Sequence, residues 1–172
     1  MLTADDLRQL LFYDPTTGDF LWRERPSLTL ADRRWNGRYA RTKAGGRMVC
    51  KKVVYWRITI ANKNYLAHRL AVLYVTGEWP PDLVDHWDND GLNNRWSNLR
   101  MASRSQNAAN SPVRSDNKTG YKGVSRRGKR FVAGIEFNGK RKTLGTFDTP
   151  QDAHAAYVSA AKRHFHDFAR TA

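Results

Sequence analysis

Apolar and polar positions alternate at helical spacing near the start of the chain. Leu7, Leu10 and Leu11 form a short apolar stripe, which predicts an amphipathic helix. Thr3 precedes Asp6 by three residues, and this spacing resembles a capping box, in which the two side chains satisfy free backbone N–H groups. We therefore expect a short N-terminal helix.

The pattern then changes to turns and strands. Residues 14–18 (DPTTG) predict a turn, and a short strand is expected around residues 20–22. Residues 26–47 show no clear period. Residues 53–60 have the β-branched and aromatic content of a strand, and residues 62–64 (NKN) predict the turn of a hairpin.

A second helical pattern covers residues 66–76, where leucines recur at helical spacing until Gly77 ends the run. An apolar pair at residues 83–84 predicts a strand that leads into a loop rich in Asp, Asn and Gly. Another short strand is expected near residues 99–101, and Ser103 is placed to begin a helix.

The last third of the chain has a cleaner pattern. Residues 111–119 have the polar composition of a linker. Three short strands are expected at residues 121–127, 130–138 and 141–147, and a helix from residue 149 to about residue 164. Three strands and one helix make a small α+β domain, in which the helix covers one face of the sheet.

The net charge of the chain indicates a class of binding partner. The chain of 172 residues has 30 Lys plus Arg against 16 Asp plus Glu, a formal net charge of +14. The segment from Ser111 onward has 13 basic and 5 acidic residues and so contributes +8 of that charge. An excess of this size favours binding to a polyanion, of which nucleic acid is the commonest.

Cys50 is the only cysteine, which excludes an internal disulfide and a zinc site built from two or more thiolates, and it fits a reducing compartment. Residues 1–15 are acidic and amphipathic, unlike a signal peptide. No stretch approaches the roughly 20 apolar residues of a membrane helix. We therefore expect a cytoplasmic protein of the host cell, without a signal peptide, a transmembrane segment or a membrane partner.

The polar loop in the middle of the chain carries a dense motif. Residues 85–107 include the sequences DHWDNDGLNNRWSNLR and SRSQN, which closely resemble the core of HNH nucleases, especially the homing-endonuclease branch. The three letters of the motif fall on His86, Asn98 and Asn107, and an Asp directly precedes the His. The likeness covers about residues 66–110 and is specific, because several residues match at fixed spacings.

This resemblance implies metal-assisted hydrolysis of a DNA phosphodiester bond. An imidazole titrates near neutrality, so His86 can take a proton from the attacking water as general base. A hard divalent cation prefers oxygen ligands, and the side chains of Asp85 and Asn107 offer two. Mg²⁺ is the expected ion, with Mn²⁺ as the alternative. The resemblance places Asp85 and His86 on the first strand of a ββα-metal motif and Asn107 on its helix.

Adjacent residues of a regular strand point to opposite faces, so Asp85 and His86 cannot both face one centre unless the strand ends or bulges there. By resemblance, Asn98 is structural: it bridges the long loop so that His86 stays oriented, and its loss can still abolish activity. His68 is expected to pack or to hydrogen-bond within its own helix.

Other interpretations stay open. Taken singly, His86 is an ordinary polar residue, Asn107 a surface residue, and the Asp and Asn of residues 88–94 turn formers. The chain could be a non-catalytic DNA-binding regulator, or a structural metal-binding module that scaffolds other proteins. The intact set of Asp85, His86 and Asn107 favours a nuclease over the first, and two oxygen ligands make a poor closed site for the second.

The region after the linker resembles the ethylene-response-factor (Apetala) DNA-binding domain. The matching residues are GYKGV at 120–124, LGTF at 144–147 and a helix containing Ala153, Ala156 and Tyr157. The resemblance implies a three-stranded sheet that lies in the major groove of double-stranded DNA, with the helix on its opposite face. The DNA-binding residues predicted on this basis are Lys122, Arg126, Arg127, Lys129, Arg130, Lys140, Arg141 and Thr143.

The base-reading positions depart from that family's pattern. Where the family tends to have Arg, Arg and Trp, this sequence has Ser125, Glu136 and Thr143. A bidentate side chain contact to a base gives about 1–3 kcal/mol of discrimination. Without such contacts, we expect the domain mainly to anchor the DNA backbone.

The patterns predict an α+β protein, and the HNH resemblance implies a ββα-metal nuclease core within it. We expect a basic strand-containing extension at 1–62, the nuclease domain at 63–110, a linker at 111–119, and a DNA-binding domain at 120–172 with a small three-stranded antiparallel sheet packed on one helix. The HNH resemblance implies the activity of a homing endonuclease from a phage or mobile element, which leaves 5′-phosphate and 3′-hydroxyl ends. A nicking monomer and a homodimer that cuts both strands stay open.

Overall fold

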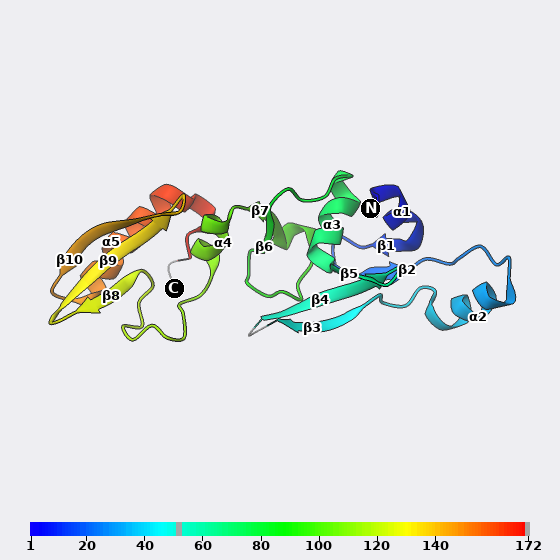
Figure 1. Ribbon diagram of the computed structural model, residues 1–172, viewed down its shortest axis with the longest axis horizontal. Coiled ribbons are helices and arrows are strands. Elements are labelled where there is room, and N and C mark those ends of the chain that lie inside the picture. The colour runs from blue at the N-terminus through cyan, green and yellow to red at the C-terminus, as the bar shows by residue number, and fades with distance from the viewer. Residues whose placement is uncertain (51–52, 171–172) are drawn as a thin grey trace. The chain divides into compact units, whose positions relative to one another are not determined.

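The structure is a computed structural model that describes residues 1–50 and 53–170. It mixes helices and strands, and Figure 1 labels them in chain order. The chain forms two compact units, Met1–Met101 and Ala102–Ala172. Among the described residues, no helix combines the length and the apolar character needed to cross a membrane.

The first unit begins with a capped helix. Helix α1 (Ala4–Leu10) starts after Thr3, and the Thr3 and Asp6 side chains form both bonds of a capping box, so the predicted helix is confirmed. Strand β1 (Leu11–Tyr13) follows without a break and pairs antiparallel with β2 (Phe20–Trp22) across the turn that the sequence predicts.

Helix α2 (Leu30–Tyr39) lies in the stretch where no period was evident. It has a capping box of its own, between Thr29 and Asp32, and none of its residues is buried. A helix that buries no apolar stripe leaves no hydrophobic period in the sequence, so the cap was the one local signal available.

A three-stranded antiparallel sheet contains β3 (Gly46–Cys50), β4 (Val53–Ile60) and β5 (Lys63–Leu66), in that order. The hairpin between β4 and β5 turns at Ala61 and Asn62, whose φ angles are 47° and 61°. Residues 63 and 64, predicted to be part of the turn, instead pair with β4. A two-residue hairpin turn of type I′ needs positive φ at both central positions, and the strand resumes directly after them.

Helix α3 (Ala67–Thr76) ends at Gly77, which has a φ of 85° and caps the helix as predicted. Its inner face joins the main core of this unit, whose buried residues include Leu7, Phe20, Ile58 and Leu70. This core draws on both sides of the predicted boundary at residue 62. The N-terminal residues are therefore part of the same hydrophobic core as α3, rather than an appendage to it.

The motif region forms a short hairpin. Strand β6 (Leu83–His86) pairs with β7 (Leu99–Ala102), and the loop between them ends in a 3₁₀ turn, η1 (Trp96–Asn98). Helix α4 (Arg104–Asn110) follows, and its N-cap Ser103 makes a capping box with Gln106. The predicted helix start at Ser103 is thereby confirmed.

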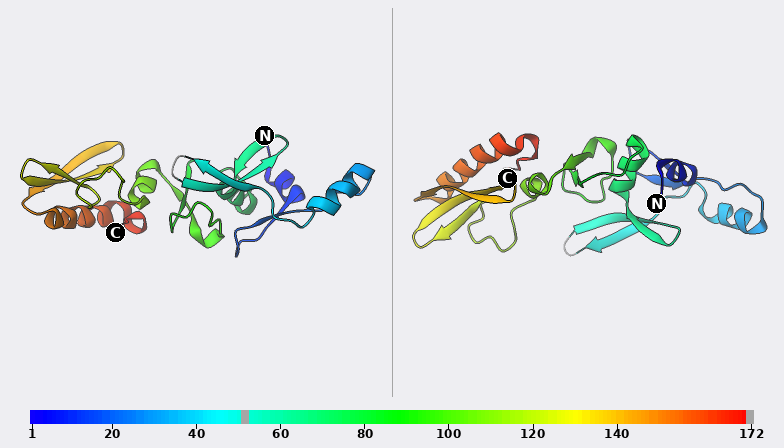
Figure 2. Two further views of the ribbon diagram at one scale, coloured as in Figure 1. Left: turned by 90° about the horizontal axis from the view of Figure 1, so that it is seen from below. Right: turned by 45° about the horizontal axis from the view of Figure 1, so that its top comes forward.

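The second unit contains an antiparallel sheet of β8 (Val124–Arg127), β9 (Arg130–Phe137) and β10 (Lys140–Phe147), with β9 in the centre. Helix α5 (Pro150–Phe165) runs along one face of this sheet, and the short 3₁₀ turn η2 (His166–Phe168) follows it (Figure 2). The contact between helix and sheet buries residues from both, namely Val124, Ala133, Ile135, Ala153, Tyr157, Ala160, Ala161 and Phe165.

Helix α4 belongs to the second unit by its contacts. Ala109 is buried in the same cluster as Ile135 and Tyr157, and the backbone N–H of Arg170 donates to the carbonyl of Ala109 at 3.2 Å. The first compact unit therefore ends at residue 101, before the predicted linker at 111–119. The reason is that α4 packs on the elements that follow it in the chain. The division into functional domains stays a prediction.

Candidate active site

The predicted base and the predicted metal ligand lie at the end of β6. Asp85 and His86 are both buried, at 5% exposure each, and the strand ends at His86, as the sequence argument required of this position. The two side chains contact different partners, as expected of neighbouring residues on a strand. Asp85 pairs with Arg100 and His86 with Asn94.

A set of three side chains surrounds the imidazole of His86. Its Nε2 lies 3.3 Å from Oδ1 of Asn94, while the rings of His68 and Tyr55 have centroids 4.9 Å and 6.2 Å away. Burial lowers the pKa of His86, and the bond to Asn94 and the nearby Asp88 carboxylate oppose this shift in part. The ring is therefore neutral near pH 7, the state in which an imidazole can accept a proton.

His68 is a site residue that the sequence did not indicate. We expected it to pack or to hydrogen-bond within its own helix, yet its ring stands edge-on to the ring of His86, and its centroid lies 5.5 Å from that of Tyr55. It is only 5% exposed, its Nδ1 makes no hydrogen bond in the part of the chain described, and burial is the largest cause that lowers its pKa to about 3. A clue was available, since His68 lies inside the stretch that resembles the HNH family.

Asn98 holds the loop between the two strands of the hairpin. Its Oδ1 accepts from the backbone N–H of Asp88 at 3.1 Å, and its Nδ2 donates to Oδ1 of Asp88 at 2.9 Å and to the carbonyl of Asn93 at 2.8 Å. The side chain thus ties both ends of the loop together while it is nearly buried. The role of Asn98 in keeping His86 oriented stays a prediction.

Residues far upstream support the same loop. The hydroxyl of Tyr13 donates to the carbonyl of Asn94 at 2.8 Å, and the backbone N–H of Trp96 donates to the carbonyl of Pro15 at 3.0 Å. A Cβ at Gly18, which has a φ of 79°, would come within 2.4 Å of the backbone of residues 94 and 95. The turn at residues 14–18 therefore packs closely against the loop that places Asn94 beside His86.

Asp85 faces a cation of the protein itself. Nε of Arg100 lies 2.9 Å from its Oδ2, and the same guanidinium covers the ring of Trp87 at 4.3 Å. Within residues 1–50 and 53–170 no three His, Cys, Asp or Glu side chains gather into a metal-binding group. An ion held by one carboxylate and one amide oxygen needs no such group, because phosphate oxygens and water can complete the shell of Mg²⁺.

Asn107 lies in the middle of α4 and is half-buried. Its backbone N–H donates to the carbonyl of Ser103, and its own carbonyl accepts from the N–H of Ser111. The helix therefore fixes the backbone of Asn107 within the second unit. Its part in holding a metal stays a prediction.

Seven of the eight residues predicted to bind DNA are exposed, with Lys122 as the exception. Ala133 and Ile135 of β9 are buried under α5, so the residues between and beside them point to the open face of the sheet. By register, Arg141 stands opposite Glu136 and Thr143 opposite Gly134, both on this open face. The exposed set is Arg126, Arg127, Lys129, Arg130, Lys140, Arg141 and Thr143.

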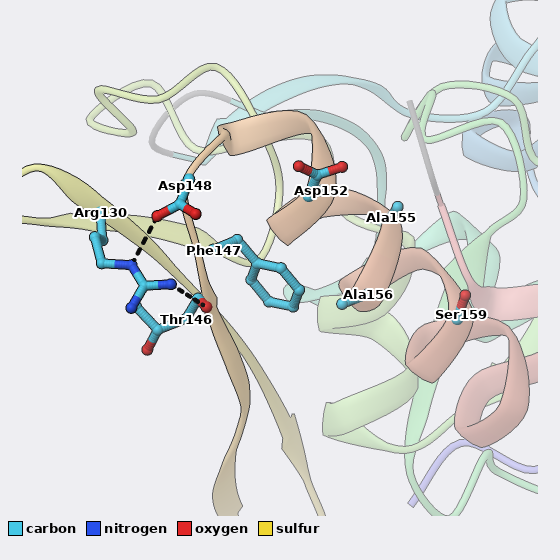
Figure 3. Close-up of a pocket in the computed structure, with 8 residues that line it drawn as sticks. All are labelled: Arg130, Thr146, Phe147, Asp148, Asp152, Ala155, Ala156 and Ser159. Atoms are coloured by element: carbon cyan, nitrogen blue, oxygen red, sulfur yellow. Dashed lines mark hydrogen bonds and ion pairs between the residues drawn. The ribbon is translucent and has the colours of Figure 1, made fainter.

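Arg130 is held by an ion pair as well as by a hydrogen bond. Its Nε lies 3.0 Å from Oδ1 of Asp148 and its Nη2 donates to the carbonyl of Thr146 at 3.2 Å, beside a shallow cavity of about 550 Å³ (Figure 3). Two carboxylates, Asp148 and Asp152, line this cavity. Their charge disfavours a phosphate at this end of the sheet.

Lys122 is turned inward. It is half-buried, and its Nζ donates to backbone carbonyls at the end of α4. The structure thus gives its ammonium partners within the protein, and the predicted contact of Lys122 with DNA stays a prediction.

Known proteins share the motif region. Residues 65–109 match the family model described as HNH endonuclease. Over 108 residues the chain is 35% identical to an Acanthamoeba polyphaga mimivirus protein called "Uncharacterized HNH endonuclease L560", an alignment that covers 62% of this chain and 56% of that protein. The chain thus spans little more than half the length of this relative. Both likenesses are to HNH endonucleases, and the family match lies in residues 65–109.

Proposed function

We propose that this protein is a divalent-metal-dependent DNA endonuclease of the homing type, with His86 as general base and the ion held by Asp85 and Asn107. The observation that carries the proposal is the state of His86: a buried, neutral imidazole fixed by Asn94 at the end of a strand, directly after a buried carboxylate. A general base needs this combination of a fixed position and an available lone pair.

The contact with Asn94 selects one form of the imidazole. Nδ2 of Asn94 donates to the carbonyl of Leu92 at 3.1 Å, which leaves Oδ1 directed at Nε2 of His86. An amide oxygen only accepts, so this pair favours the tautomer with the proton on Nε2. The basic lone pair is then on Nδ1, and Nδ1 is the atom that takes the proton from the attacking water.

Asp85 and Asn107 present oxygen donors, the ligand type that Mg²⁺ and Mn²⁺ prefer. When bound, such an ion stabilises the negative charge on the phosphate and on the departing 3′ oxygen. Nε of Arg100 donates to the Asp85 carboxylate at 2.9 Å and limits its rotation, since the pair is largely buried. The products would carry 5′-phosphate and 3′-hydroxyl ends.

We propose double-stranded DNA as the substrate and residues 120–172 as an Apetala-type module that holds it. Support comes from the exposed basic side chains on and around the open face of the sheet, opposite the helix. Glu136 and Thr143 occupy this face where the family's pattern has Arg and Trp. The module should therefore contact phosphates more than bases.

The test is cleavage of supercoiled plasmid with Mg²⁺ by the wild type and two matched variants. H86N keeps a polar side chain but has no basic nitrogen, and H166N makes the same change at an exposed histidine of the second unit. We expect nicking or linearisation by the wild type and H166N, lost with EDTA and with H86N. Equal cutting by H86N would refute the mechanism.

A site-specific enzyme needs its target, so the assay is repeated on a genomic DNA library with Mn²⁺. Cutting there by the wild type but not by H86N supports the same proposal. Retarded DNA that is never cut on either substrate would instead identify a non-catalytic DNA-binding regulator.

A further inference from the structure

The ammonium of Lys122 lies among three backbone carbonyls. Its Nζ donates to the carbonyl of Ala108 at 3.2 Å, to that of Ala109 at 2.5 Å, and to that of Ser111. An ammonium has three N–H donors, and here each has an acceptor. Burial, with a smaller effect of Arg170, lowers the pKa of Lys122 to about 8, so the group stays mainly protonated at pH 7.

These carbonyls belong to the end of α4, which the structure ends at Asn110. The last carbonyls of a helix have no partner within the helix and carry partial negative charge. A cation near them is favourable, and α4 has no basic residue of its own in its last turn. Lys122 supplies that cation from a position 12 residues beyond the helix end.

Helix α4 needs such outside support. It has seven residues, far fewer than the roughly 12–15 at which an isolated helix becomes stable in water. Its contacts in this unit include the burial of Ala109 against the α5 cluster and the bond from the N–H of Arg170. Lys122 adds three hydrogen bonds at the same end of the helix.

We propose that Lys122 is a positioning residue for cleavage: it clamps the end of α4 and so fixes the helix that carries Asn107, instead of contacting DNA. The inference rests on the proposed function of Asn107. Asn107 lies within one helical turn of the carbonyls that Lys122 binds. If the end of α4 becomes mobile, the side chain of Asn107 becomes mobile with it. A Lys122 that neutralised a phosphate would have to release α4, because its donors are already used.

The test compares K122M with K118M, which makes the same change at an exposed lysine four positions earlier. Three quantities are measured: the cleavage rate at saturating DNA, the Kd for DNA with its salt dependence, and amide hydrogen exchange of residues 107–111 in the free protein. For K122M we expect a cleavage rate about 10- to 100-fold lower, faster exchange at the end of α4, and an unchanged Kd and salt slope. K118M should leave the cleavage rate and the exchange unchanged.

K122R is the conservative variant, since a guanidinium can donate to the same carbonyls, and we expect it to restore both protection and cleavage. A K122M protein that keeps its protection at 107–111 but binds DNA more weakly, with a salt slope smaller by about one, overturns the proposal and makes Lys122 a phosphate contact. If K122M does not fold, K122Q is measured in its place with the same expectations. The exchange readout needs no cleavage, so a failure of the proposed nuclease function is recognised separately.

Discussion

The ring of His68 stands edge-on to the ring of His86, with centroids 4.9 Å apart and planes at 88°. His68 lies on α3 and His86 ends β6, so this contact joins the helix of the main core to the candidate base. Both rings are buried and both have a lowered pKa. Protonation of these histidines in acid therefore affects both the hydrophobic core and the candidate site.

The stability of the first unit should fall in acid because of His68. Its pKa is about 3 in the folded protein and about 6.5 when unfolded, so the unfolded state binds more protons between these values. The stability is fully present above about pH 6.5 and declines by up to about 1.4 kcal/mol per pH unit below it. Urea unfolding of the wild type and of H68F at about pH 7 and about pH 5 should show a smaller loss in H68F. Equal losses would show that His68 does not titrate as described.

Cleavage should have an acid limb below the ordinary histidine pKa. Burial lowers the pKa of His86, and a protonated imidazole cannot take a proton from water. The rate at saturating DNA should hold down to below about pH 6.5 and then drop about tenfold per pH unit. H166N should give the same profile. An acid limb that begins above about pH 6.5 would contradict a lowered pKa of His86 as the base.

Gly18 and Gly77 form a matched pair for testing the support of the loop. Both have positive φ, 79° and 85°, but a Cβ at Gly18 would clash with the backbone of Asn94 and Arg95, whereas one at Gly77 meets open space. We expect G77A to cost about 1 kcal/mol and G18A about 2–3 kcal/mol more. G18A should also lower cleavage, since Asn94 holds His86. Chemical denaturation and plasmid assays check both, and similar costs for the two variants would contradict the close packing.

Asn98 should be costly to replace. In N98A the N–H of Asp88 and the carbonyl of Asn93 each lose a hydrogen bond in a part-buried setting. We expect a loss of about 2–3 kcal/mol with faster hydrogen exchange in residues 88–94. N64A, which removes a single exposed bond to Thr59, should cost less than about 1 kcal/mol. If N98A loses no more stability than N64A, the structural role of Asn98 is refuted.

The open face of the sheet can be tested with two arginines. R141A removes a cation from the face opposite α5, and R163A removes an exposed one from α5 itself. We expect R141A to weaken DNA binding across all sequences and to reduce the salt slope by about one, with little change in R163A. Titrations at several salt concentrations measure this. The reverse pattern would place the DNA on the helix side.

Local signals were sufficient for most elements. The capping residues Thr3 and Ser103, the helix stop at Gly77 and the strand content of residues 53–60 all lead to the observed structure, since each acts through neighbours within a few positions. Helix α2 was not predicted, because it buries no residue and its sequence therefore has no hydrophobic period. The hairpin turn shifted to residues 61–62 because backbone φ, more than residue type, decided it.

The sequence by itself determined where His86, Asn98 and Asn107 lie along the chain, and that a basic three-stranded unit follows them. Only the tertiary structure decided what meets them: His68 and Tyr13 arrive from 18 and 81 residues away to reach His86 and Asn94. The tertiary structure also directs the ammonium of Lys122 to backbone carbonyls at the end of α4. Periodicity and caps report contacts along one element, whereas these contacts depend on how separate elements share a core, and no local pattern encodes that.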